Sequence, residues 1–184
     1  ASESQIGENI PMKDTRIQNL ARILVRYSVA AKTREMIAVD GQTPAEPLIL
    51  AVYEELLRVG AYPVVRMAPS DAAETFFRSA RPLHFETISP MQRAQVRLLH
   101  GSIGIAAAAN TRALSTVDPR QQAKLSRTAQ PLREQMMKKK WCITLFPTPA
   151  YAQEADMSLR EFENFVYAAT LADQDRPERL WAEQ

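Results

Sequence analysis

The chain has 184 residues, of which 46% are hydrophobic and 24% are charged, values that suit one globular domain with a single core. Its net charge of +2 gives no electrostatic reason to expect a nucleic acid or a membrane surface as a partner. The single cysteine, Cys142, excludes an intramolecular disulfide, and the polar amino terminus lacks the pattern of a secretory signal peptide. Together these features predict a cytoplasmic protein without membrane spans.

Short apolar runs alternate with segments of helical period along the chain. Ahead of them, residues 1–12 show no period, and we expect a flexible tail or an expression remnant followed by one α/β domain over residues 13–184. Pro131 interrupts one long helical segment and predicts a kink or a break there. The expected strands cover residues 35–39, 62–67, 102–109 and 141–145. The expected helices cover residues 13–28, 43–59, 71–80, 89–99, 119–140 and 158–169.

Strands that alternate with helices along a chain are typical of a parallel sheet covered by helices. We therefore expect an α/β fold with a mostly parallel sheet of about four strands and helices on both faces, Rossmann-like or flavodoxin-like. The flavodoxin-like order 2-1-3-4 is the first expectation, although several strand orders satisfy the same pattern. In such sheets the loops after the carboxyl ends of the strands line the functional crevice, here residues 40–47, 110–119 and 146–153.

The sequence lacks the short motifs of common nucleotide and metal sites, namely a glycine-rich dinucleotide loop, a P-loop, His-Glu-x-x-His and Cys-x-x-Cys. The two histidines, His84 and His100, are too few for a histidine-rich metal site, and His100 is placed to interact with the end of a helix dipole. Cys142 follows a tryptophan in an apolar strand, which indicates a small buried filler rather than a catalytic thiol. The cations of Lys138–Lys140 fall in the last turn of a helix, where they complement its dipole.

Two loops of the expected crevice are unusual in composition. The loop after the third strand combines amide, hydroxyl and guanidinium groups, and the loop after the fourth is stiff and moderately apolar. A rigid apolar loop beside polar donors suits a ligand wall or a domain interface, although the two loops could also simply cap the edge of the sheet. The candidate site residues in these loops are Asn110, Thr111, Arg112, Thr148, Pro149, Tyr151 and Gln153.

Several stretches of the sequence resemble one family. The most specific are NTRALS (110–115) with VDP (117–119), and TLFPTPAYAQE (144–154) with MSL (157–159). Shorter ones are LARILV (20–25), AEPL (45–48) and GAYPVVR (60–66). Over nearly the whole chain, from about Lys13 to Trp181, the sequence resembles the amino-terminal domain of the thermophilic metallo-aminopeptidase family, the group that includes aminopeptidase T.

The resemblance implies an exopeptidase that removes amino-terminal residues from peptides with two divalent metal ions, commonly zinc or cobalt, and that forms homodimers. In the family, the metal ligands and the catalytic carboxylate belong to a carboxyl-terminal domain, and this sequence stops at Gln184, before that domain begins. We therefore expect no catalytic residue, no metal ligand and no cofactor in this chain.

The favoured hypothesis is the non-catalytic amino-terminal domain of such an enzyme, which covers the active-site cleft and contacts its own catalytic domain. One alternative is a stand-alone α/β binding or interaction module that uses the same loops to hold a peptide, a small ligand or another protein. A further alternative is a flavodoxin-like domain that binds a nucleotide through its loops. A domain without its partner should also expose an apolar patch and self-associate, as a dimer, through that patch.

Overall fold

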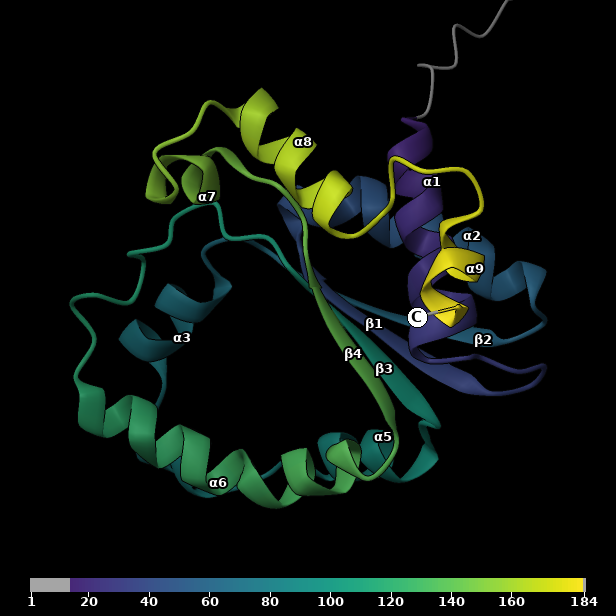
Figure 1. Cartoon of the computed structure of the whole chain (residues 1–184). Helices are drawn as coiled ribbons and strands as arrows, with labels where there is room; N and C mark the ends of the chain where they lie inside the picture. Colours follow the sequence, from purple (N-terminus) through teal and green to yellow (C-terminus); the bar gives the residue numbers. More distant parts are fainter. Residues whose placement is uncertain (1–13, 184) are drawn as a thin grey trace, which may run out of the picture.

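Four parallel strands form one sheet in the computed structural model, which describes residues 14–183 (Figure 1). The strand order is β2-β1-β3-β4, which confirms both the α/β class and the first-expected order. The expectation of a tail over residues 1–12 lies outside the described residues. The strands are β1 Met36–Gln42, β2 Tyr62–Ala68, β3 Gly101–Ala106 and β4 Lys140–Leu145.

Helices begin where the sequence offers caps. The hydroxyls of Ser89 and Ser158 each accept a hydrogen bond from the backbone N–H three residues later, so both complete a capping box. The described helices are α1 Thr15–Arg22, the π-helix η1 Ile23–Ser28, the 3-10 helix η2 Thr43–Ala45, α2 Glu46–Arg58, α3 Ala72–Ser79, α4 Pro82–Glu86, α5 Pro90–Leu98, α6 Pro119–Met137, α7 Pro149–Glu154, α8 Leu159–Ala169 and α9 Pro177–Ala182.

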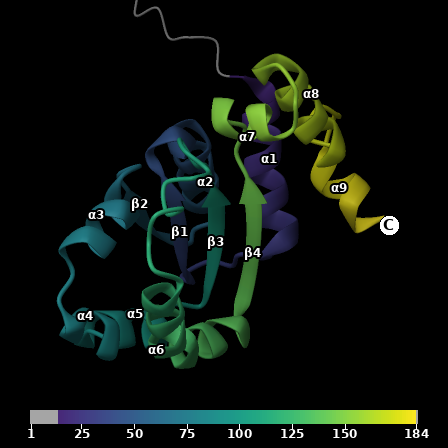
Figure 2. The same ribbon diagram turned by 90° about the vertical axis from the view of Figure 1, so that its left-hand side faces the viewer.

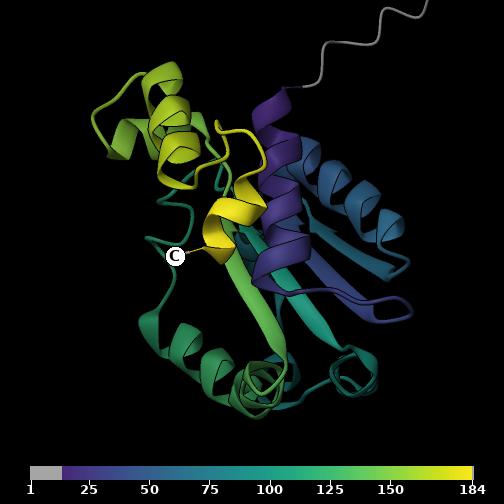
Figure 3. The same cartoon turned by 45° about the vertical axis from the view of Figure 1, so that its right-hand side comes forward.

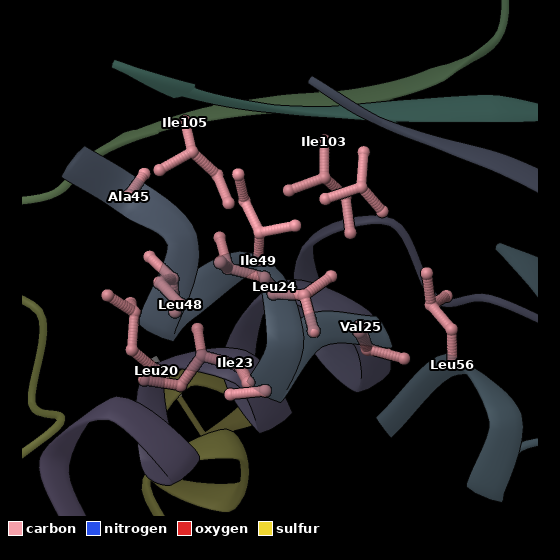
Figure 4. Close-up of a cluster of buried hydrophobic side chains, with 14 of the residues drawn as sticks. Leu20, Ile23, Leu24, Val25, Ala45, Leu48, Ile49, Leu56, Ile103 and Ile105 are labelled. Carbon is pink, nitrogen blue, oxygen red and sulfur yellow. The ribbon is translucent and has the colours of Figure 1, made fainter. Parts of the chain in front are cut away.

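The main core lies on one face of the sheet, where α1 and α2 are packed (Figures 1 and 3). Side chains alternate along β3, so Ile103 and Ile105 point to this face and are buried. In Figure 4 they meet Ile49 of α2, with Leu24 and Leu20 in the layer beneath. This face therefore carries most of the apolar burial that stabilises the fold.

The opposite face, which we call the open face, carries Ser102, Gly104, Trp141 and Ile143. Figure 2 looks onto it and shows α3, α5, α6 and α7 at its margins rather than across its centre. Trp141 keeps 46% of its surface exposed and Ile143 keeps 72%, although both lie in a strand. The two faces are thus covered unequally, with a continuous helix layer on one of them.

The predicted end of the first strand is wrong, because β1 continues through Asp40 and Gly41 to Gln42. The guanidinium of Arg66 in β2 binds the carboxylate of Asp40, with 2.5 Å between Nε and Oδ1, and this pair holds the strand ends together. A Cβ on Gly41 would lie 2.9 Å from Cδ1 of Ile49. Gly41 therefore leaves room for the end of the Ile49 side chain, which would have to shift if a Cβ were present, and it lies within the strand rather than in a turn.

The loop predicted after β4 is partly helical. Residues 149–154 form α7, with Thr148 as its N-cap and Pro149 at the first helical position, where a missing N–H costs nothing. The break predicted at Pro131 does not occur, and α6 continues through it. The carbonyl left without its helical partner belongs to Arg127, which is exposed, so water can bind it.

The sequence predicted a helix over residues 13–28 but not its change of hydrogen-bonding pattern at Ile23, and it predicted no helix after residue 169. The segment after α1 is a π-helix, η1, and the last described helix is α9. These two elements pack together, and the rings of Tyr27 and Trp181 lie 5.9 Å apart. Within residues 14–183, no helix combines the length and the apolar character needed to cross a membrane.

We predict that Leu48→Ala lowers the free energy of unfolding by about 3 kcal/mol, because Leu48 is fully buried in α2 and its truncation leaves a cavity. Leu50→Ala on the same helix is the matched control, since Leu50 is 59% exposed. It should change stability by less than about 0.5 kcal/mol. Urea denaturation of both variants measures the difference, and equal losses would contradict the assignment of the core.

Candidate functional site

A pocket of about 410 Å³ lies at the carboxyl ends of β3 and β4, between the loop that follows β3 and helix α7. This is the edge of the sheet at which the sequence predicted the crevice. The pocket is lined by Ala109, Asn110, Thr111, Arg112, Ala150, Gln153, Glu154 and Asp156.

One buried threonine holds the two sides of the pocket together. Thr148 is 1% exposed, and its hydroxyl donates to the backbone oxygen of Ala108, with 2.8 Å between the oxygens. The same hydroxyl accepts a hydrogen bond from the backbone N–H of Tyr151 at 3.3 Å and thereby caps α7. A further bond joins Phe146 N to Ala106 O at 2.8 Å. The loop after β3 and the start of α7 are therefore fixed relative to each other.

Polar side chains from both sides meet at the mouth of the pocket. The hydroxyl of Thr111 donates to Oε1 of Glu154 at 2.7 Å, and Nε of Arg112 lies 3.7 Å from the same oxygen. The side chain of Asn110 accepts a hydrogen bond from the backbone N–H of Arg112 at 2.9 Å and shapes the turn. The guanidinium of Arg112 is 82% exposed, so the ion pair is weak and open to competition from a ligand or a second protein surface.

The structure brings four of the predicted site residues to this pocket, namely Asn110, Thr111, Arg112 and Gln153. The other three support it from behind. Thr148 and Pro149 cap and begin α7, and Tyr151 packs against the small cluster of Ala152, Phe162 and Val166.

Sequence reasoning missed two acidic side chains of the site, Glu154 and Asp156. Gln153 and Glu154 are consecutive, and the helical turn of α7 that brings both to the pocket was taken for a loop. A correct prediction of that helical turn would have placed Glu154 beside Gln153 in the site. The third predicted crevice loop, residues 40–47, continues as strand and helix and does not line this pocket.

The described residues do not fit a metal centre. Among residues 14–183, no three His, Cys, Asp or Glu side chains gather closely enough to hold a metal ion. Nδ1 of His84 accepts a hydrogen bond from the backbone N–H of Arg81 at 3.0 Å, and Nδ1 of His100 accepts one from Met36 N at 3.1 Å. The expected role of His100 at a helix end is therefore wrong, because its ring binds the start of β1 instead.

The lysines near β4 have structural roles. Nζ of Lys139 donates to backbone oxygens at the end of α5, at 2.6 Å to Val96 and also to Leu99. Nζ of Lys140 binds the carboxylate of Glu35 at 2.7 Å. The structural interpretation is therefore confirmed for Lys139 and Lys140, but the helix end that Lys139 complements belongs to α5 rather than to its own helix.

We predict that Thr148→Val lowers the free energy of unfolding by about 1–3 kcal/mol, because it leaves the backbone oxygen of Ala108 and the first N–H groups of α7 without their partner. Thr148→Ser keeps the hydroxyl and should retain most of that stability. Chemical denaturation compares the two variants, and a valine variant as stable as the serine variant would contradict the bridging role.

The pH dependence of the reactivity of Cys142 tests how well its thiol is shielded from solvent. Burial raises the pKa of its thiol to about 12, so almost no thiolate exists near neutrality. At pH 8 its reaction with a disulfide reagent should be about a thousandfold slower than that of a free cysteine, and the rate should still rise with pH above 10. Guanidinium chloride should restore the ordinary rate, and rapid labelling of the folded protein would contradict the shielding of this partly buried thiol.

A model of the thermophilic metalloprotease (M29) family matches residues 13–184. No curated protein sequence matches the chain. Among solved structures, wild-type AmpT from Thermus thermophilus is similar in fold, with a TM-score of 0.65 at 18% identity, over 84% of this chain and 42% of that chain. This chain thus spans less than half the length of that structure. Because the family model covers nearly every residue, the chain belongs to the thermophilic metalloprotease (M29) family.

Proposed function

We propose that the chain is the non-catalytic amino-terminal domain of a metal-dependent aminopeptidase, a cytoplasmic enzyme that removes amino-terminal residues from peptides. The observation that carries the proposal is the family match over residues 13–184. The similarity to AmpT over less than half of that protein's length agrees with the role of one domain in a larger enzyme. Peptides are the substrate class of the whole enzyme, and this domain limits how they reach the active site.

In this proposal, the pocket at the carboxyl ends of β3 and β4 faces the catalytic domain. Its rim presents exposed groups of both charges, Arg112 and Glu154. Thr148 keeps the two loops rigid, so little conformational entropy is lost when they dock or cover a cleft. Asn110 and Gln153 supply hydrogen-bonding groups suited to the polar rim of a domain interface.

The two divalent metal ions expected for the family, zinc or cobalt, do not suit the described residues, which offer no cluster of three ligands. In the proposal the metal ions and the catalytic groups belong to the catalytic domain, and this domain contributes access control and support for the dimer. No chemical step is assigned to a side chain of this chain.

A second candidate is a stand-alone binding module, and the pocket itself favours it. A volume of about 410 Å³ lies within the range of small-ligand sites. Its amide, hydroxyl, guanidinium and carboxylate groups could hold a peptide or a small polar ligand. The two candidates differ in whether the loops bind a second domain or a free ligand.

We predict that the purified chain, supplied with Zn²⁺ or Co²⁺, does not hydrolyse leucyl p-nitroanilide. Fused in place of the matching part of AmpT, it should support hydrolysis of that substrate by the remaining region. Arg112→Glu combined with Gln153→Ala should lower the rate of the fusion about tenfold, since it introduces a like charge beside Glu154 at the interface. Leu50→Ala, on the exposed side of α2, is the control and should leave the rate unchanged.

Two results would contradict the proposal. Hydrolysis by the chain alone would show that it carries its own catalytic groups. A fusion that folds, as judged by circular dichroism, and gains nothing over the remaining region alone would favour the stand-alone module instead.

A further inference from the structure

A second cavity, of about 210 Å³, lies on the open face of the sheet, beside the last turns of α6. We call it the open-face cavity. Its lining comes from β1, β3, β4 and α6, and among the described residues it shares none with the pocket at the carboxyl ends of β3 and β4. It is therefore a separate site, to which no role has been assigned above.

The floor of the open-face cavity is formed by small residues of β3. In the register of the sheet, Gly104 lies between Asp40 of β1 and Ile143 of β4. Two residues earlier, Ser102 lies beside Trp141. Residues two apart in a strand share a face, so small side chains on β3 lie beside large ones on β4. The strand itself thus leaves the space above Gly104 unfilled.

The walls of the cavity are apolar and largely exposed to water. Ile143 and Trp141 line it from β4, and Met137, which is 56% exposed, lines it from α6. Parallel sheets are normally covered on both faces, so a bound apolar group would bury surface that this face leaves in water. Met136 also lines the cavity, and both methionine sulfur and an indole interact favourably with an aromatic ring. The walls therefore suit an aromatic side chain.

Side chains of opposite charge line the same cavity. Arg133 of α6 is exposed and forms no ion pair within residues 14–183, so its guanidinium is available to a carboxylate. The carboxylate of Asp40 is bound by Arg66, with 2.6 Å between Nη2 and Oδ2, yet the Asp40 side chain keeps 35% of its surface exposed. A carboxylate offers about four acceptor positions, so Asp40 can also accept hydrogen bonds from an ammonium group.

We propose that the open-face cavity binds a free aromatic α-amino acid, such as phenylalanine. The ring lies over Gly104, beside Trp141, while the carboxylate binds Arg133 and the ammonium group binds Asp40. The volume favours so small a ligand, because sites for drug-sized ligands and cofactors measure about 300–1,000 Å³. A nucleotide is too large for the cavity, and a plain hydrocarbon would leave both charges unused.

The inference rests on the proposed function only for the source of the ligand. An enzyme that removes amino-terminal residues from peptides releases free amino acids, and the cavity binds one class of these products. The shape, the aromatic wall and the two charges do not depend on the peptidase assignment. If the chain binds phenylalanine and the fusion enzyme described above is inactive, the site stands and the proposed function fails. An active fusion whose domain binds no amino acid gives the reverse.

Titration of the isotope-labelled chain with L-phenylalanine, followed by heteronuclear NMR, tests the site. The backbone amides of Gly104 and Ile143 and the indole N–H of Trp141 should shift, with a dissociation constant on the order of 1 mM for a ligand of about a dozen heavy atoms. Phenylalaninamide lacks the carboxylate and N-acetylphenylalanine lacks the ammonium group. Each should therefore bind at least about tenfold more weakly.

Two variants locate the ligand within the cavity. Arg133→Gln should weaken the binding of L-phenylalanine about tenfold and leave that of phenylalaninamide unchanged, because the amide has no carboxylate for Arg133 to bind. Arg127→Gln, on the same helix but outside the lining, is the matched control and should change neither affinity. Gly104→Val should abolish binding by filling the floor. The sheet accommodates the added Cβ, since the nearest atom it meets, Cγ1 of Ile143, is 3.4 Å away.

Several results overturn the inference. One is the absence of shifts at these three N–H groups when phenylalanine far exceeds the expected dissociation constant. Equal affinity for phenylalanine and its two derivatives overturns the recognition of both charges, as does a glutamine variant at position 133 that binds like the parent. Undiminished binding by Gly104→Val, with an unchanged circular dichroism spectrum, places the ligand outside the cavity.

Discussion

The fold depends on the burial of one face of the parallel sheet against α1 and α2. Ile37, Val39, Ile103 and Ile105 are all less than 4% exposed, and Gly41 leaves room beside them for the side chain of Ile49 of α2. Burial of apolar area is the main term that offsets the conformational entropy of the chain. Because this layer alone orders the four strands, the other face can stay largely open, and the ends of the strands can carry polar loops.

The same packing limits where polar groups are tolerated. Glu55 is 2% exposed inside α2, and its carboxylate is bound by Arg26 of η1 at 2.5 Å and by Arg58 at 3.1 Å, so its charge is compensated. Asn19 of α1 donates to the backbone oxygens of Ala172 and Gln174 and fastens the segment before α9. These buried polar contacts join elements distant in sequence. They fix the carboxyl-terminal helices against α1, and the acidic residues of that segment are consequently held at one end of the domain.

Membership of the M29 family bears on how the pocket at the carboxyl ends of β3 and β4 is interpreted. The pocket is polar and rigid, and its rim carries both charges, while the described residues hold no group of metal ligands. Such a surface is suited to recognition. Lys139 and Lys140 are occupied by structural contacts, so the positive surface available to a partner comes from the exposed arginines of α5 and α6.

Although the sequence by itself allowed several strand orders, it determined the alternation of strands and helices and the two loops of the crevice. These follow from local signals: hydrophobic period, the caps at Ser89 and Ser158, and the rule that parallel strands end at a common edge. Only the tertiary structure decided which side chains of those loops reach the pocket. Thr148 turns inward because a backbone oxygen of another loop, at Ala108, needs a donor, and no local pattern reports that need. The same reason explains the course of β1 through Gly41, the bond of Lys139 to α5 and the uneven cover of the sheet: each is set by a neighbour distant in sequence.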